Sequence, residues 1–366
     1  MSKKILVSGI KPTGRLHFGN YFGAMKQNIE LSNSGEYESF VFIADYHALT
    51  TERNGDDLRK QTIEAVASYV ACGLDLSKVI LFKQSSVPQV TELTWIFNNL
   101  VTMPYMMRAH ALKDFTDKLI HNNKIESRIE AEVFNQKDGG NTNAIKFLEL
   151  LKAKVDVNVN VGLFDYPVLM ASDILIYDAD IVPVGQDQKQ HVEYARDIAG
   201  FYNRAYNTEE FKLPKELIVE GVGSVPGIDG QKMSKSYNNH IELFCSDEDL
   251  KKRVMSIVTD SASPEDKKNP DENNIYKIHK LFLNKDEDEV LRKKFEDGGY
   301  SYKEAKEELL ATIMKWREGK KKKYDEVVDN FSELNSLLNE NGKKAEEKAK
   351  IKMEKIRKTV GLSNDF

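Results

Sequence analysis

The order of apolar and polar segments predicts strands that alternate with helices over the first 200 residues. Four short apolar runs predict strands, at residues 5–7, 39–44, 79–82 and 181–184. Between them, apolar residues recur at helical spacing over residues 21–31, 56–72, 91–100 and 191–199, and a further helix starts near Pro167. Strands that alternate with helices in this way indicate βαβ units and a parallel sheet.

Polar or glycine-rich residues follow three of these strands. They are residues 9–14, residues 45–50 and residues 185–188. In open parallel sheets, ligands bind beyond the carboxyl ends of the strands, so we expect these segments to line one pocket. The first of them also precedes a predicted helix, where free N–H groups attract a phosphate. It matches neither the dinucleotide fingerprint nor the P-loop, and a plain strand-to-helix turn remains the alternative.

The predicted helix from Pro167 carries an acidic residue among apolar ones. Helical spacing places Tyr166, Met170 and Asp173 near one face. A carboxylate in such surroundings needs a partner, which is either a protein group or a ligand. His191, in the following helix, is expected to be a packing residue or to support a site residue, rather than to be a catalyst.

Residues 221–239 are rich in glycine, proline and serine, and predict a mobile loop. Lys232 and Lys235 are spaced so that both amines could reach one polyphosphate. By itself such a pair is more typical of a solvated surface, so its meaning depends on the opening turn.

Composition narrows the class of protein. The 366 residues suggest about two domains, and no apolar span is long enough to cross a membrane. The N-terminus is interpreted as a first strand and not as a signal peptide. Cys72 and Cys245 lack the spacing of a metal site or a disulfide framework, which fits a cytoplasmic protein.

Charge and periodicity set the second part of the chain apart. The net charge of −5 arises before Ser246, because basic and acidic residues balance from there onward. Helices are predicted at residues 247–258, 281–289, 302–318, 324–338 and 343–360. Lys320 to Lys323, placed between two of them, could contact a nucleic-acid backbone or could simply be solvated.

Two motifs and the segment between them resemble one family. His17-Phe18-Gly19-Asn20 is similar to the first signature of the class I aminoacyl-tRNA synthetases, in the form that tryptophanyl-tRNA synthetases use. Lys232-Met233-Ser234-Lys235-Ser236 is their second signature, and residues 162–198 resemble the bacterial tryptophan enzymes almost throughout. The resemblance is good over residues 4–113 and 160–262 and loose beyond.

This resemblance implies a fold, a reaction and partners. The fold is α/β: a Rossmann-type, doubly wound parallel sheet forms a catalytic domain over residues 1–245, with an insertion at about 114–158. An α-helical, anticodon-binding domain would cover residues 246–366, with its terminal helix packing back on the catalytic domain. The reaction joins L-tryptophan to its tRNA through tryptophanyl-adenylate, with ATP and Mg²⁺, in a cytoplasmic homodimer.

The resemblance also implies site residues. Lys232, Ser234, Lys235 and Asn20 would be catalytic. ATP would be bound by Lys11, Pro12, Thr13, His17, Gly19, Asn20, Gly185, Gln186, Asp187, Val225, Lys232, Met233, Ser234, Lys235 and Ser236. Tryptophan would be bound by Asp173, Met170, Tyr166, Gln188, His47 and Gly9, with Asp173 reading the indole N–H. No protein metal site is expected.

Some features depart from the family, and other functions stay open. Lys11 and Tyr46 stand where glutamine is usual, and the insertion is either a plain surface segment or a lid or dimer contact. A tyrosyl-tRNA synthetase shares both signatures but would need a phenol-binding pair of Tyr and Asp. A small nucleotidyltransferase shares the first signature but is usually much shorter. A catalytically silent, tRNA-binding relative would not need both lysines of the second signature.

Overall fold

The computed structural model describes residues 3–108, 145–146, 149, 160–185, 188–218 and 224–363. Its centre is a five-stranded parallel sheet with strand order β3-β2-β1-β4-β5. The strands are β1 (Lys4–Ile10), β2 (Tyr37–Ile43), β3 (Val79–Lys83), β4 (Ile181–Val184) and β5 (Lys215–Ile218). The strand order reverses its direction at β1. Because ligands bind outside the carboxyl ends of the strands at such a reversal, the predicted binding site lies between β1 and β4. The Rossmann-type fold class is thereby confirmed, and β5 is a strand that the sequence pattern did not predict.

Helices cover both faces of the sheet. Alternate residues of β1 and β2 enter two apolar clusters, with Val41 and Ile43 on one face and Phe40 and Phe42 on the other. The elements of this part are α1 (Phe18–Asn20), the π-helical turn η1 (Tyr21–Met25), α2 (Lys26–Asn33), α3 (Asp45–Ala48), α4 (Gly55–Ala71), the 3₁₀ turn η2 (Gln84–Ser86), α5 (Gln89–Asn98), α6 (Met103–Met106), α10 (Val161–Leu175) and α11 (Lys189–Ala205).

Two helix starts differ from the prediction because asparagines cap them. The Asn54 side chain accepts the N–H groups of Asp56 and Asp57, so α4 starts before Asp56. The Asn160 side chain accepts the Leu163 N–H, so α10 starts six residues before Pro167. Pro167 therefore lies inside α10, at its seventh residue.

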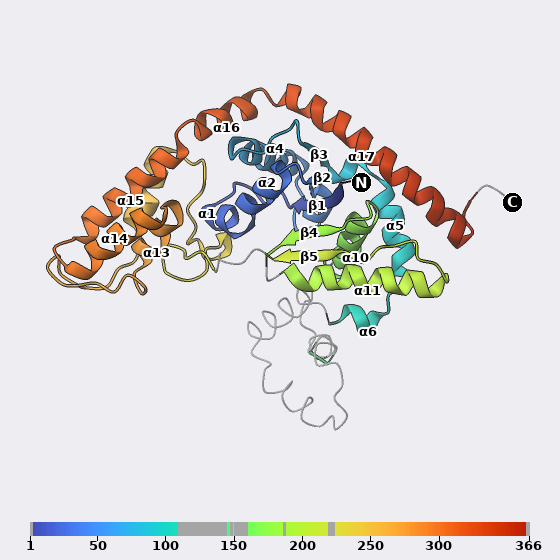
Figure 1. Ribbon diagram of the computed structural model, residues 1–366, viewed down its shortest axis with the longest axis horizontal. Helices are drawn as coiled ribbons and strands as arrows, with labels where there is room; N and C mark the ends of the chain where they lie inside the picture. The colour runs from blue at the N-terminus through green and yellow to red at the C-terminus, as the bar shows by residue number, and fades with distance from the viewer. Residues whose placement is uncertain are drawn as a thin grey trace.

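The elements of the second part of the chain are helices and helical turns. They are the 3₁₀ turn η4 (Lys235–Tyr237), α12 (Asp247–Met255), α13 (Asn274–His279), the 3₁₀ turn η5 (Lys280–Phe282), α14 (Lys285–Asp297), α15 (Tyr302–Arg317), α16 (Lys320–Asp329) and α17 (Phe331–Val360). Of these, α13, α14 and α15 lie together at one end of the molecule, and α17 extends toward the opposite end (Figure 1). None of the helices among the described residues has the length and apolar character needed to span a membrane.

Three details of the helical prediction were wrong. The expected helix at 281–289 is interrupted, because Asn284 caps a new helix by accepting the N–H groups of Asp286 and Glu287. The last break falls at Asn330 and not near residue 340, so that α17 is one continuous helix of 30 residues. Lys320 to Lys323 form the first turn of α16 rather than a linker.

Helix α17 returns from the helical end and packs along β3 and α5 (Figure 1). The Asn341 amide donates to the Leu81 carbonyl at 3.2 Å, which satisfies a group on the edge strand β3. Arg357 forms an ion pair with Glu92 of α5. The apolar face of α17 joins the same cluster as α5 and α10, so the end of the chain is part of the core beside the sheet.

Candidate functional site

A pocket of about 520 Å³ opens at the carboxyl edge of the sheet, between β1 and β4. A volume of this size suits a small-molecule ligand. Seven predicted site residues line it, from four separate segments: Gly9, Lys11, His47, Tyr166, Met170, Gly185 and Gln188. Phe42, Ile174 and Val182, which are not among the predicted site residues, add apolar walls. Segments at the carboxyl ends of the first, second and fourth predicted strands thus line one cavity, as expected.

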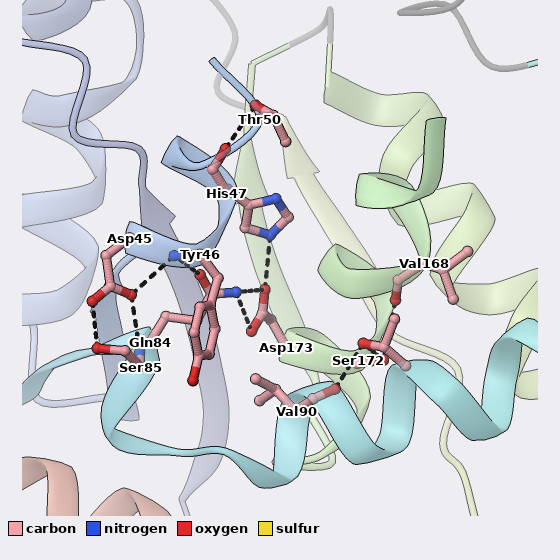
Figure 2. A network of polar contacts seen from close by, with 11 residues as sticks. Asp45, Tyr46, His47, Thr50, Gln84, Ser85, Val90, Val168, Ser172 and Asp173 are labelled. Carbon is pink, nitrogen blue, oxygen red and sulfur yellow. Dashed lines mark hydrogen bonds and ion pairs between the residues drawn. The ribbon is translucent and has the colours of Figure 1, made fainter. Parts of the chain in front are cut away.

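Asp173 lies behind this lining. Asp173 is only 2% exposed. Its Oδ2 lies 3.0 Å from His47 Nε2 (Figure 2). The His47 side chain, in turn, lines the pocket. Since a carboxylate accepts, the bond requires the His47 proton on Nε2. Burial raises the pKa of Asp173, and the hydrogen bonds from His47 and Gln84 oppose that rise.

Gln84 is the partner of Asp173 that the sequence reasoning missed. Its Nε2 donates to both carboxylate oxygens, at 2.9 and 2.8 Å, and its Oε1 accepts the Tyr46 N–H at 3.1 Å (Figure 2). The residue is 1% exposed. It directly follows β3, so the rule that singled out residues 45–50 and 185–188 would also have found it.

Asp45 fastens the turn that carries Gln84. Its carboxylate accepts the Ser85 N–H at 2.9 Å and the Ser85 hydroxyl, as well as the Tyr46 N–H at 3.0 Å (Figure 2). Hydrogen bonds to the Asp45 side chain therefore join the turn after β2 to the turn after β3. On the other side of the pocket, Tyr166 Oη is 2.8 Å from His191 Nε2, so His191 supports a lining residue, as predicted.

The two signature segments touch one another next to this pocket. Phe18 N–H donates to the Ile241 carbonyl and Leu243 N–H to the Leu16 carbonyl, in a short antiparallel pairing. Gly19 N–H donates to Met233 Sδ at 3.2 Å. Lys235 Nζ donates to the Thr13 carbonyl at 2.6 Å. Residues more than 200 positions apart thus form one surface.

The other predicted nucleotide residues take places around this contact. Asn20 Oδ1 accepts the His17 N–H at 3.1 Å, and Lys11 Nζ donates to Thr50 Oγ1 at 3.0 Å. Pro12 and Val225 are buried, and the Val225 carbonyl accepts the Met233 N–H. Lys232 and Ser236 are exposed, while the Ser234 hydroxyl accepts the Ser236 N–H. Gln186 and Asp187 lie outside the described residues, as does most of the predicted insertion.

His17 is held neutral in this arrangement. Burial, together with the nearby Lys235 and His240, lowers its pKa to about 4. The His17 and His240 rings lie 5.6 Å apart. The positive charge of this half of the site therefore comes from its lysines, while His17 provides a neutral imidazole.

Comparison with known proteins agrees with this geometry. A sequence model of the family described as "tRNA synthetases class I (W and Y)" matches residues 2–135 and 140–317. The tryptophan–tRNA ligase of Fusobacterium nucleatum is 45% identical over 356 residues, which are 97% of each chain. That of Rhodopirellula baltica is 39% identical over 98% of this chain and 99% of its own.

Solved structures give the same answer. The tryptophanyl-tRNA synthetase of Campylobacter jejuni, complexed with ADP and tryptophan, superposes with a TM-score of 0.80 at 38% identity, covering 98% of this chain and 99% of its own. The Mycoplasma pneumoniae enzyme, at 24% identity and a TM-score of 0.72, shows the shared fold. The chain belongs to the class I tRNA synthetases of the tryptophan and tyrosine group, and within it to the tryptophan–tRNA ligases.

Proposed function

We propose that the pocket beside β1 and β4 binds L-tryptophan, and that the joined signature segments bind ATP next to it. The observation that carries this proposal is the contact of Lys235 with the carbonyl of Thr13, which lies two residues after the pocket-lining Lys11. The Campylobacter jejuni relative, which was solved with ADP and tryptophan, supports the same pairing of ligands.

The first step is adenylate formation. A carboxylate oxygen of tryptophan attacks the α-phosphorus of ATP, the bond to the bridging oxygen breaks, and pyrophosphate leaves. Such a displacement depends on positioning and on stabilisation of charge. Lys232 and Lys235 neutralise charge on the departing pyrophosphate, while Lys11, Thr13 and the segment around Asn20 hold the nucleotide. In the second step the tryptophanyl group passes to the 3′-terminal ribose of the tRNA.

We assign selection of tryptophan to the network behind the pocket. A carboxylate offers about four acceptor positions. Gln84 occupies one on each oxygen of Asp173 and His47 occupies a second on Oδ2, which leaves Oδ1 able to accept one more donor. An indole N–H that reaches Asp173 beside His47 would fill that position, and phenylalanine would leave it empty at a considerable cost in free energy. Met170 packs on the ring, and Tyr166 and Gln188 bind the amino acid's polar groups.

Mg²⁺ is expected to enter with ATP. Within the described ranges, no group of three or more His, Cys, Asp or Glu side chains is placed to hold a metal ion. We therefore assign its ligands to phosphate oxygens, where the ion adds to the charge neutralisation that the two lysines provide.

The second part of the chain, residues 246–366, is assigned to the tRNA, with the lysines of α16 toward its backbone. A homodimer is proposed as well. A second hollow of about 340 Å³ shares Thr50 and Tyr166 with the pocket. The side chain of Trp95 in this hollow is 71% exposed, which suits a surface that a second copy covers.

ATP–pyrophosphate exchange with each of the twenty amino acids tests the proposal. Exchange that depends on tryptophan, followed by tryptophan transfer to tRNA, is the expected result. Exchange with tyrosine alone would favour the tyrosyl alternative, and exchange with no amino acid would favour the silent relative.

A further inference from the structure

Asn239 is a buried polar residue three positions after the end of the second signature. It is 1% exposed, whereas its neighbour Asn238 is exposed. The sequence reasoning gave Asn239 no role. We use the term lysine loop for residues 224–239, which include both signature lysines.

The Asn239 carboxamide bonds to three different points of the lysine loop. Its Oδ1 accepts the Ser234 N–H at 2.7 Å. Its Nδ2 donates to the Lys232 carbonyl at 3.1 Å and to Asp229 Oδ1 at 2.8 Å. One side chain thus holds the backbone on both sides of Met233, between the two lysines.

The backbone of the lysine loop is built closely around this side chain. Ile228 N–H donates to the Asn239 carbonyl at 2.9 Å. A Cβ atom at Gly227 would lie 2.4 Å from Asn239 Cγ, so only glycine fits there. Pro226 and Lys232 pair across the same loop. The side chain fills the centre of the loop, and its bonds require an acceptor and a donor on one short group.

We infer that Asn239 is the positioning residue of the lysine loop, which sets the places of Lys232 and Lys235 for the pyrophosphate of ATP. This inference rests on the proposed function. It assigns a role that neither signature contains, since Asn239 acts through backbone groups and does not itself meet the nucleotide.

The chain offers a matched control in the adjacent residue. Asn238 Oδ1 accepts from Arg253 Nη2 at 2.6 Å, so aspartate at 238 keeps that acceptor and gains an ion pair. Aspartate at 239 keeps the bond to Ser234 but loses both donors, and sets a second carboxylate against Asp229. Replacement of asparagine by aspartate is therefore expected to be tolerated at position 238 and to disturb the lysine loop at position 239.

The experiment measures single-turnover adenylate formation at varied ATP concentration, together with equilibrium tryptophan binding. For Asn239→Asp we expect kcat/KM for ATP to fall by about 10- to 100-fold, the range for buried polar groups left unpaired. The tryptophan Kd should stay within about twofold, as additivity of separate sites predicts. Asn238→Asp should match the wild type in both measurements.

A second variant repairs the defect. Asp229→Asn combined with Asn239→Asp restores one donor and acceptor between the two side chains, and should recover part of the ATP kinetics. If Asn239→Asp does not fold, the single variant Asp229→Asn tests the inference. We expect it to lower kcat/KM for ATP by a smaller factor and to leave the tryptophan Kd unchanged. Equal kinetics for the 238 and 239 variants, or a parallel loss of tryptophan binding, would overturn the inference. A wild type without tryptophan-dependent exchange would instead refute the proposed function.

Discussion

The two halves of the site are built by opposite means. On the side to which we assign tryptophan, Asp173 and Gln84 are buried, and their hydrogen bonds join α10 to α3 and η2, the turns that follow β2 and β3. On the ATP side, Lys232 is exposed and the lysines sit on a loop whose inner bonds depend largely on Asn239. One half is part of the core, and the other is a surface segment that Val225, Met233 and Asn239 anchor in the interior.

This difference shows how one fold can combine selection of an amino acid with movement of the lysine loop. Discrimination between aromatic amino acids needs a fixed carboxylate, because a group that relaxes toward the wrong ligand no longer rejects it. Charge neutralisation on a departing pyrophosphate needs groups that can follow it, and loops supply such motion. We therefore expect variants of the two halves to act on separate kinetic constants.

Removal of a signature lysine should have the largest effect. Lys235→Ala should slow adenylate formation by about 10²- to 10³-fold, the loss typical of one donor aimed at transition-state charge. Rapid-quench measurement of the adenylate checks this value. Lys252→Ala, which removes an exposed lysine of α12, is the control and should match the wild type. An unchanged rate for Lys235→Ala would remove this lysine from the chemical step.

A change at Asp173 should have the next largest effect, on the other ligand. Asp173→Asn keeps the shape but presents an NH₂ group to donors, so the tryptophan KM should rise by about 100-fold while the ATP KM changes little. Steady-state exchange kinetics measure both constants. Asp165→Asn on the same helix, outside the main pocket, is the matched control. A comparable rise in both KM values would contradict a role confined to tryptophan.

Loss of Gln84 should give a smaller shift of the same kind. Gln84→Leu preserves much of the volume but leaves Asp173 with His47 as its remaining protein partner, so we expect the tryptophan KM to rise about 10-fold. Gln89→Leu, which changes a buried glutamine that bonds to Glu346 of α17, should leave that KM unaltered. The two variants are compared in the same exchange assay. A Gln84→Leu enzyme with wild-type KM would show that the network does not orient the carboxylate.

Acidification should produce the smallest effect. His17 and His279 both have pKa values of about 4, because burial disfavours their charged forms. The unfolded chain then binds more protons than the folded chain between about pH 6.5 and 4, so the free energy of unfolding should decrease as the pH falls through that window. Thermal midpoints at pH 7 and 5 measure this slope. His17→Gln should reduce it, and a slope unaltered by His17→Gln would place the proton uptake elsewhere.

Much of the fold followed from local pattern, and the errors have identifiable physical causes. Strand ends located the pocket because parallel strands share one carboxyl edge. Helix boundaries failed at Asn54, Asn160 and Asn284, where a side-chain cap outweighed apolar periodicity. The uninterrupted α17 could not be predicted, since contacts with β3 and α5 stabilise it through residues remote in sequence.

The candidate site was predictable only in part. The two signatures named the groups to which we assign the nucleotide, but not the residues that position those groups. Gln84 and Asn239 are ordinary polar residues in the sequence, and their importance comes from burial and from partners up to 89 positions away. The sequence alone does not show which polar residues are buried, so these supporting residues could be identified only from the structure.

The most direct test of the separation between the halves is the tryptophan Kd of Lys235→Ala without ATP. Equilibrium titration of the wild type and the variant gives the two constants. A tryptophan half that is formed by the core predicts values within about twofold of each other. A Kd weakened about 10-fold or more would mean that the lysine loop helps to form the tryptophan pocket, and would contradict the account.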